Sequence, residues 1–159
     1  MLRRVWAKRG ERPLVVVEPR YQWRWLYGFV QPQTGRTHFA LHSKVNTDTF
    51  NQVLGQFAAA VGAGPYHRIV LMVDGAGWHR SKGLVVPEGL HLVAMPAYSP
   101  ELQPAERLWP LSNESVANRH FATLADLEAA QQARCQALGQ MVEVVRSYTL
   151  FDWWPRIAK

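Results

Sequence analysis

Two short apolar runs, each leading to a carboxylate, constrain the fold of this chain more than any other feature. The first run is Ile69–Val73, and the second extends from Leu90 to Met95. Apolar runs of about four to eight residues are typical of strands buried in a sheet. The first run ends at Asp74, and the second leads through a loop with three prolines to Glu106, at the start of a predicted helix. The sequence therefore predicts two acids that project from the ends of neighbouring elements.

A hairpin and several helices are predicted around these strands. Residues 23–30 and 37–42 are strand-like and flank a segment whose Pro and Gly are typical of a hairpin loop. Apolar residues recur at helical spacing from Asn46 or Thr47 to about Val61, where Gly62 follows. Further elements are a short strand at 14–17, a helical turn at 78–84, a helix from about Pro104 to Asn118, and a helix beginning at Thr123, along which Leu124, Leu127, Ala130, Arg134 and Leu138 recur. This order predicts an α/β fold, with helices packed on a mixed sheet.

The composition is that of an ordinary soluble domain. With 159 residues, of which 48% are hydrophobic, the chain is long enough for one domain with its own core and short for two. No apolar run approaches the ~20 residues of a membrane span. Cys135 is the single cysteine, which excludes a disulfide framework and a thiolate metal cluster. We expect Cys135 on an apolar helix face and the protein in the cytoplasm.

The formal net charge of +6 favours polyanionic partners, because each Lys or Arg beside a phosphate releases condensed counterions. Basic residues gather near the N-terminus, at Arg3, Arg4, Lys8, Arg9, Arg12, Arg20 and Arg24. A solvated surface stretch explains this charge equally well. Nucleic acid binding is therefore a hypothesis at this point.

The two acids suit a divalent-metal site that acts on phosphates, and each also has a structural alternative. Asp74 follows a predicted strand, where an Asp often caps the next turn. Glu106 lies in the first turn of a predicted helix, where an acid meets the helix dipole favourably, and Glu101 could cap equally well. His79 could orient a metal-bound water or a phosphate, or simply pack. Trp23, Trp25 and Tyr27 alternate along one strand, and we expect them in the core rather than stacked on bases.

Two longer motifs make the sequence recognisable. Val73-Asp-Gly-Ala-Gly-Trp-His79 and Pro96-Ala-Tyr-Ser-Pro-Glu-Leu-Gln-Pro-Ala-Glu-Arg-Leu-Trp109 together closely resemble the bacterial insertion-sequence transposases of the mariner-like DDE superfamily. The resemblance extends to residues 6–10, 27–30 and 118–121. Gln103 stands where the family usually has Asn, and the interval of 32 positions between the two acids is slightly shorter than usual.

The resemblance implies an RNase H-like (integrase-like) fold and DNA transposition by metal-dependent strand cleavage and strand transfer. Asp74 and Glu106 match the second and third catalytic acids, which would bind Mg²⁺ or Mn²⁺. Residues 1–159 would form a single catalytic domain without the family's DNA-recognition domain. The implied partners are DNA (element ends and target) and a second copy in a homodimer, with localisation in the cytoplasm at the nucleoid. The expected DNA contacts are Arg3, Arg4, Lys8, Arg9, His79, Arg80, Lys82 and Arg107.

The first catalytic Asp of the family is expected to be absent from this chain. In the family it lies on the first, central strand of the sheet, upstream of the segment that here begins at Arg3. Glu18 is a weak substitute for it, and Asp48 is a weaker one. An upstream-encoded portion could supply the missing strand. Alternatively, the chain is a catalytically inactive fragment that acts at most as a DNA-binding or interaction module.

Overall fold

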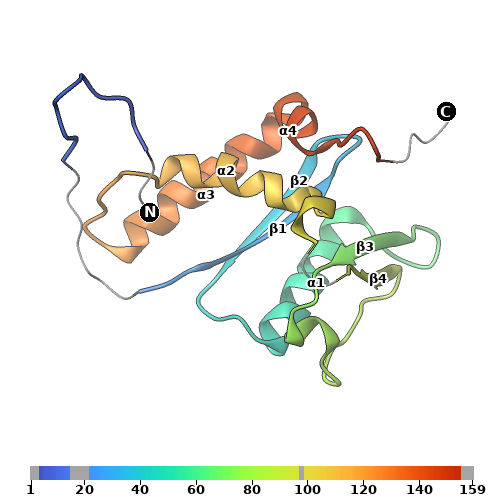
Figure 1. Ribbon diagram of the computed structural model, residues 1–159. Coiled ribbons are helices and arrows are strands. Elements are labelled where there is room, and N and C mark those ends of the chain that lie inside the picture. Colours follow the sequence, from blue (N-terminus) through green and yellow to red (C-terminus); the bar gives the residue numbers. More distant parts are fainter. Residues whose placement is uncertain (1–3, 15–21, 97–98, 155–159) are drawn as a thin grey trace.

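The computed structural model describes residues 4–14, 22–96 and 99–154 (Figure 1). Within these residues, no helix combines the length and the apolar character that a membrane span requires. The elements are β1 (Trp25–Gln31), β2 (Arg36–His42), α1 (Thr47–Val61), β3 (Ile69–Val73), η1 (Gly77–Arg80), β4 (Leu90–Ala94), η2 (Pro100–Leu102), η3 (Pro104–Arg107), α2 (Leu108–Ser112), η4 (Asn113–Ser115), α3 (Leu124–Gln140) and α4 (Val142–Thr149), where η denotes a 3₁₀ helix. The α/β architecture is the one that the order of sequence patterns predicts.

The predicted hairpin is confirmed. Strands β1 and β2 are antiparallel, with Trp25 opposite His42 at one end and Gln31 opposite Arg36 at the other. The turn closes through Gly35, which adopts a φ of 70° and donates its N–H to the Gln31 carbonyl at 2.9 Å. A positive φ costs glycine little, which explains its presence in this turn.

Strands β3 and β4 form a separate parallel pair, in which Ile69 lies opposite Leu90 and Val73 opposite Ala94. The Met95 N–H extends the ladder by donating to the Val73 carbonyl at 2.8 Å. In the described part of the chain, the four strands therefore form two two-stranded sheets rather than one mixed sheet. Because β1 and β3 each pair with one strand among the described residues, each has an edge that no other described strand pairs with.

One helix supports both pairs of strands. Asn46 caps α1 by accepting from the Thr49 N–H at 2.8 Å, and Gly62 ends it in the left-handed conformation, as the sequence predicts. The buried face of α1 packs against Phe29 of β1 and against Val73 and Leu90 of the parallel pair. Phe29 stacks on Phe57 of α1 at 4.3 Å between ring centroids (the buried face also includes Phe50, Val53, Leu54 and Ala58). Burial of each large apolar side chain here contributes about 1.5–3 kcal/mol, so this shared core holds the two sheets together.

A second core lies on the other side of the hairpin. It contains Leu108 and Leu111 of α2, Leu138 of α3 and Val145 of α4, with Trp109 packed against it. The α3 N-terminus is fixed by a capping box between Thr123 and Asp126, as its sequence indicates. However, the buried residues of α3 are Gln131, Cys135 and Leu138, whereas the expected Leu124, Leu127 and Ala130 are half-buried.

Three expectations about local structure were wrong. The helix expected from Pro104 to Asn118 is divided into η3, α2 and η4. Pro110 explains the division, because a residue without an N–H is tolerated in the first turn of α2 but would interrupt a helix that began at Pro104. Trp23 and Trp25 are exposed rather than in the core. Leu14 is exposed and lies in no strand, while the remainder of the expected 14–17 strand falls outside the described residues.

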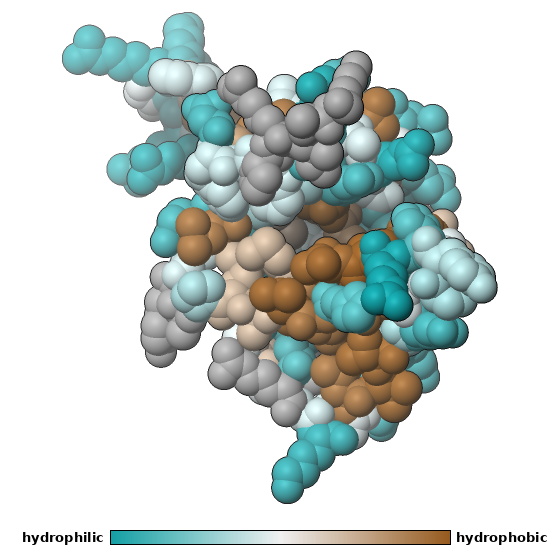
Figure 2. All heavy atoms as spheres, turned by 90° about the vertical axis from the view of Figure 1, so that its right-hand side faces the viewer, coloured by the Kyte–Doolittle hydropathy of each residue, from teal (hydrophilic) through white to brown (hydrophobic). Residues whose placement is uncertain are grey.

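The parallel strands are buried on one face only, which also differs from expectation. Ile69, Leu71 and Leu92 face the α1 core, while Val70, Met72 and Val93 are exposed. Figure 2 views the molecule from the side of β3 and β4 and shows apolar side chains gathered there. The α2–α4 helices cover the hairpin and leave this face open, so the alternation of buried and exposed positions follows the strand repeat of two.

Candidate active site

The carboxylate of Asp74 lies directly after β3, at the carboxyl end of the parallel pair. Its Oδ1 accepts a hydrogen bond from the Ala76 N–H at 3.0 Å, so the turn through Gly75 fixes the orientation of the side chain. The side chain remains 53% exposed. An oriented and accessible carboxylate at this edge is suited to bind a cation or a phosphate-bound metal.

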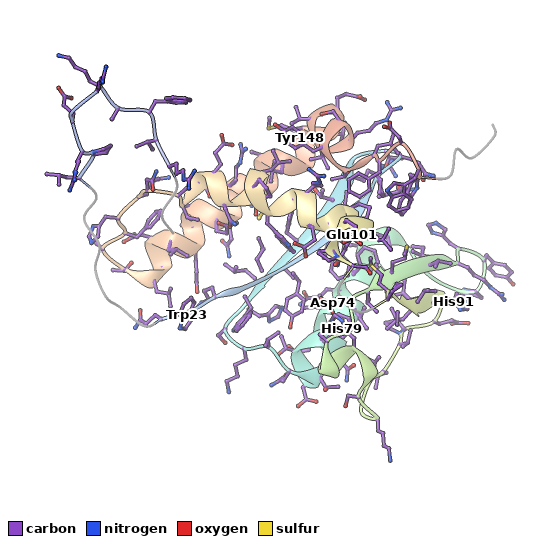
Figure 3. The ribbon with its side chains drawn as sticks, in the orientation of Figure 1. Trp23, Asp74, His79, His91, Glu101 and Tyr148 are labelled. Carbon is purple, nitrogen blue, oxygen red and sulfur yellow. The ribbon has the colours of Figure 1, made fainter. Side chains whose placement is uncertain are left out.

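His79, on η1, holds the same carboxylate. Its Nδ1 lies 2.7 Å from Oδ1 of Asp74 and 3.2 Å from the Asp74 backbone carbonyl. The imidazole packs against Phe50 of α1, with 4.2 Å between ring centroids, and its side chain is only 11% exposed. Figure 3 shows Asp74 and His79 side by side at the end of β3. From sequence, His79 could orient a metal-bound water or a phosphate, or simply pack; the structure places its Nδ1 against Asp74 and its ring against Phe50.

The contribution of Phe50 was missed by the sequence analysis. Phe50 lies in α1, far along the chain from His79, and the two rings meet only because η1 packs on α1. In the sequence, Phe50 does not differ from the other apolar residues of the helix face. No local pattern could have indicated that it supports a histidine of the site.

Glu106 is positioned by a loop anchored in the fold. It lies in the first turn of η3, and its N–H donates to the Gln103 carbonyl at 3.0 Å. Pro104 before it is buried, and the Trp109 ring after it lies against Gly28 of β1 so closely that an added Cβ there would be 3.1 Å away. Trp109 is therefore a packing residue that fixes the loop on the hairpin. The carboxylate of Glu106 itself is exposed.

The carboxylates of Asp74 and Glu106 are the type of donor that a hard divalent cation binds. The described residues, however, contain no complete set of metal ligands. Carboxylate oxygens are the ligands that Mg²⁺ prefers. Within residues 4–14, 22–96 and 99–154, however, no group of three or more His, Cys, Asp or Glu side chains converges as a metal cage would. Asp48 lies in the first turn of α1, and Glu18 falls outside the described residues. Asp74 and Glu106 are thus candidate metal ligands, and no described residue completes a group of three with them.

Comparison with known proteins identifies the family. Residues 1–128 match the family model described as DDE superfamily endonuclease. The chain belongs to the DDE superfamily endonucleases. An uncharacterized protein of Sinorhizobium fredii, y4pE/y4sA, is 28% identical over 132 residues, which cover 82% of this chain and 96% of that protein.

The fold is confirmed by a solved structure. A chain in the crystal structure of the Mos1 strand transfer complex superposes with a TM-score of 0.56 and 14% identity, over 92% of this chain. The match spans 49% of the Mos1 chain, about half its length. At this level of identity the likeness concerns the fold, which is RNase H-like as predicted.

The basic residues expected to contact DNA in this endonuclease family member are partly described. Arg4, Lys8 and Arg9 are exposed in the segment 4–14, and Lys82 and Arg107 are exposed near the two acids in sequence. Arg3 and the side chain of Arg80 fall outside the described residues. Arg24, in contrast, is paired with Glu128 of α3 and has a structural role.

Cys135 takes the place expected for it. The thiol is buried on α3, and burial raises its pKa above the ordinary value. A thiol held protonated is a poor nucleophile. Cys135 is therefore not a candidate nucleophile.

Proposed function

We propose that this chain is the catalytic part of a transposase that cleaves DNA strands and transfers them with the help of Mg²⁺ or Mn²⁺. The observation that carries the proposal is the Asp74 carboxylate, held at the end of β3 by the Ala76 N–H and by His79 in a chain of the DDE endonuclease family. Such fixed geometry suits a ligand that must keep its position during phosphoryl transfer.

Asp74 and Glu106 would hold the metal, which when bound activates the attacking oxygen and stabilises the leaving oxygen of the phosphodiester. His79 would keep one oxygen of Asp74 engaged, so that the carboxylate presents a constant face to its ligand. Lys82 and Arg107, both exposed, would bind DNA phosphates on either side of the cut.

A third carboxylate is part of the proposal. Among the described residues, β1 and β3 each have an edge outside a ladder, and both strands pack on α1 through one core. An extended segment that pairs with these edges would join the two sheets and could bring an Asp to the end of β3. We propose that an upstream-encoded portion supplies this strand and that two copies of the assembled domain act together as a homodimer.

A second candidate function is DNA binding without cleavage. It is favoured by the lack of a three-ligand cluster in the described part of the chain, together with the exposed cations of segment 4–14. In that case the net charge of +6 would support salt-dependent association with DNA phosphates and no chemistry.

Nicking of supercoiled plasmid by the purified chain separates these functions. The chain is incubated with Mn²⁺, alone and co-purified with the upstream-encoded polypeptide, beside a sample containing EDTA. We expect EDTA-sensitive nicking that is strongest with the upstream polypeptide. Equal nicking by the chain alone and by the chain with the upstream polypeptide would indicate that the third ligand lies within this chain. A folded chain that shifts DNA in a gel but nicks in neither sample would support the binding module and contradict the proposal.

The contact of His79 with Asp74 predicts how the affinity for Mn²⁺ should change among variants of His79. His79→Phe keeps a ring against Phe50 but removes Nδ1, so the affinity for Mn²⁺ should fall about 10–100-fold, the usual effect of losing a partner that orients a ligand. His79→Asn restores a nitrogen near the Nδ1 position and should recover part of that affinity. Electron paramagnetic resonance during a titration with Mn²⁺ measures the affinity of each variant. Equal affinities in the Phe and Asn variants would mean that His79 only fills space.

A further inference from the structure

Three aromatic rings follow α4 and belong to neither hydrophobic core. Phe151 and Trp153 lie 5.4 Å apart between ring centroids, and Trp153 and Trp154 lie 5.5 Å apart. The Trp154 N–H donates to the Phe151 carbonyl at 3.0 Å, so a tight turn sets the spacing of the rings. We call Phe151, Trp153 and Trp154 the aromatic strip. Trp153 is 51% exposed, which leaves much of its indole surface open to a ligand.

The aromatic strip is joined to the proposed site by a cation. The guanidinium of Arg107 lies over the Phe151 ring, with Cζ 5.4 Å from the centroid. Arg107 directly follows Glu106 on η3, and η3 also packs against α4, which leads into the strip. In Figure 3, Glu101 marks the loop that carries η2 and η3. The strip therefore contacts the residue that directly follows Glu106, one of the two candidate metal ligands.

An exposed indole with neighbouring rings and an arginine close by has a specific chemical use. The faces of paired bases are covered by their neighbours in a duplex, whereas an unpaired base offers a face for stacking on indole. The arginine can at the same time meet the phosphate that the base carries. The rings distinguish unpaired from paired nucleotides but read no hydrogen-bonding edge, so such binding tolerates any base.

We propose that the aromatic strip binds unpaired nucleotides of DNA, with Trp153 stacking on a base and Arg107 contacting a phosphate. The proposal rests on the proposed function, because unpaired nucleotides next to Glu106 arise where a strand is opened for cleavage. The strip would hold the opened strand in place beside the carboxylates. The strip would give the chain a preference for single strands, whereas its other exposed cations would bind any polyanion.

Fluorescence anisotropy with a labelled oligo-dT 12-mer and a labelled duplex of equal length tests the proposal in EDTA. Wild type is compared with Trp153→Ala, Trp153→Phe and Trp23→Ala. Trp23 is a matched control, since it is 71% exposed and Figure 3 shows it at the far side of the hairpin. We expect Trp153→Ala to lose about ten-fold in affinity for the 12-mer, within the range of one lost stacking interaction, and little for the duplex. Trp153→Phe should recover most of the loss, and Trp23→Ala should match wild type.

Several outcomes would overturn the proposal. Unchanged 12-mer binding by Trp153→Ala would do so, as would equal losses in Trp153→Ala and Trp23→Ala, or an equal loss for 12-mer and duplex. Because the measurement needs no metal and no cleavage, it is independent of plasmid nicking. Single-strand binding through Trp153 in a chain that never nicks would leave the strip established and the proposed cleavage contradicted.

Discussion

Replacement of Glu106 by Gln is expected to reduce metal-dependent nicking by about a thousand-fold or more. The change keeps the size of the side chain and the backbone of η3, and it removes the negative charge that would hold the cation. A metal that stabilises a phosphoryl transition state contributes several kcal/mol, and each 1.36 kcal/mol corresponds to about ten-fold in rate. The carboxylate is exposed, so the loss of its charge should leave the thermal unfolding midpoint almost unchanged.

Glu101→Gln is the matched control for this prediction. Glu101 is an exposed acid on η2, five positions before Glu106 in the same proline-rich loop. If general negative charge in the loop mattered, both variants would lose activity equally. We expect Glu101→Gln to retain nicking within a few-fold of wild type and to bind Mn²⁺ normally. Full activity in Glu106→Gln would contradict the assignment of Glu106 as a metal ligand.

Replacement of Gly35 by Ala is expected to destabilise the protein by about 3 kcal/mol, from backbone strain at positive φ and from a steric clash. A Cβ at Gly35 would lie 1.9 Å from the Val142 carbonyl oxygen and 3.0 Å from the Arg146 nitrogen, both backbone atoms of α4. The backbone of the hairpin turn thus touches the start of α4. To relieve the clash, α4 would have to move and withdraw Val145, which is fully buried, from the second core. Chemical denaturation should report the loss.

Gly55→Ala provides a control of opposite sign. Gly55 lies in the middle of α1, and a Cβ built there meets no atom within 4 Å other than the neighbouring backbone of its own helix. Since Ala favours a helix over Gly by about 0.5–1 kcal/mol, this variant should be more stable than wild type. A Gly35→Ala variant as stable as wild type would show that α4 does not rest on the turn.

Much of the fold could be predicted because its signals are local. Asn46 and Gly62 delimit α1, and Thr123 with Asp126 begins α3, since capping depends on groups within three or four residues. The hairpin around Gly35 and the two apolar runs were predicted for the same reason. The RNase H-like fold came from the resemblance, and a solved structure confirmed it.

The wrong predictions concern which faces are buried, because contacts between distant parts of the chain determine this. The periodicity of α3 identified a helix but not which of its faces meets α2, so Gln131 is buried while Leu124, Leu127 and Ala130 are only half-buried. The exposed face of β3 and β4 could not be predicted either, because burial of a strand's second face depends on where the later helices pack.

The sequence by itself indicated the family and predicted the two candidate acids, one after a strand and one after a proline-rich loop. It did so because the motifs containing Asp74 and Glu106 are contiguous, and contiguous residues specify turns and caps through short-range hydrogen bonds. Only the tertiary structure decided that His79 contacts Asp74 while its ring packs on Phe50, and that Arg107 lies over Phe151. The contacts of His79 with Phe50 and of Arg107 with Phe151 join segments far apart in the chain. They form only when the helices and sheets pack, and no local pattern encodes how those surfaces meet.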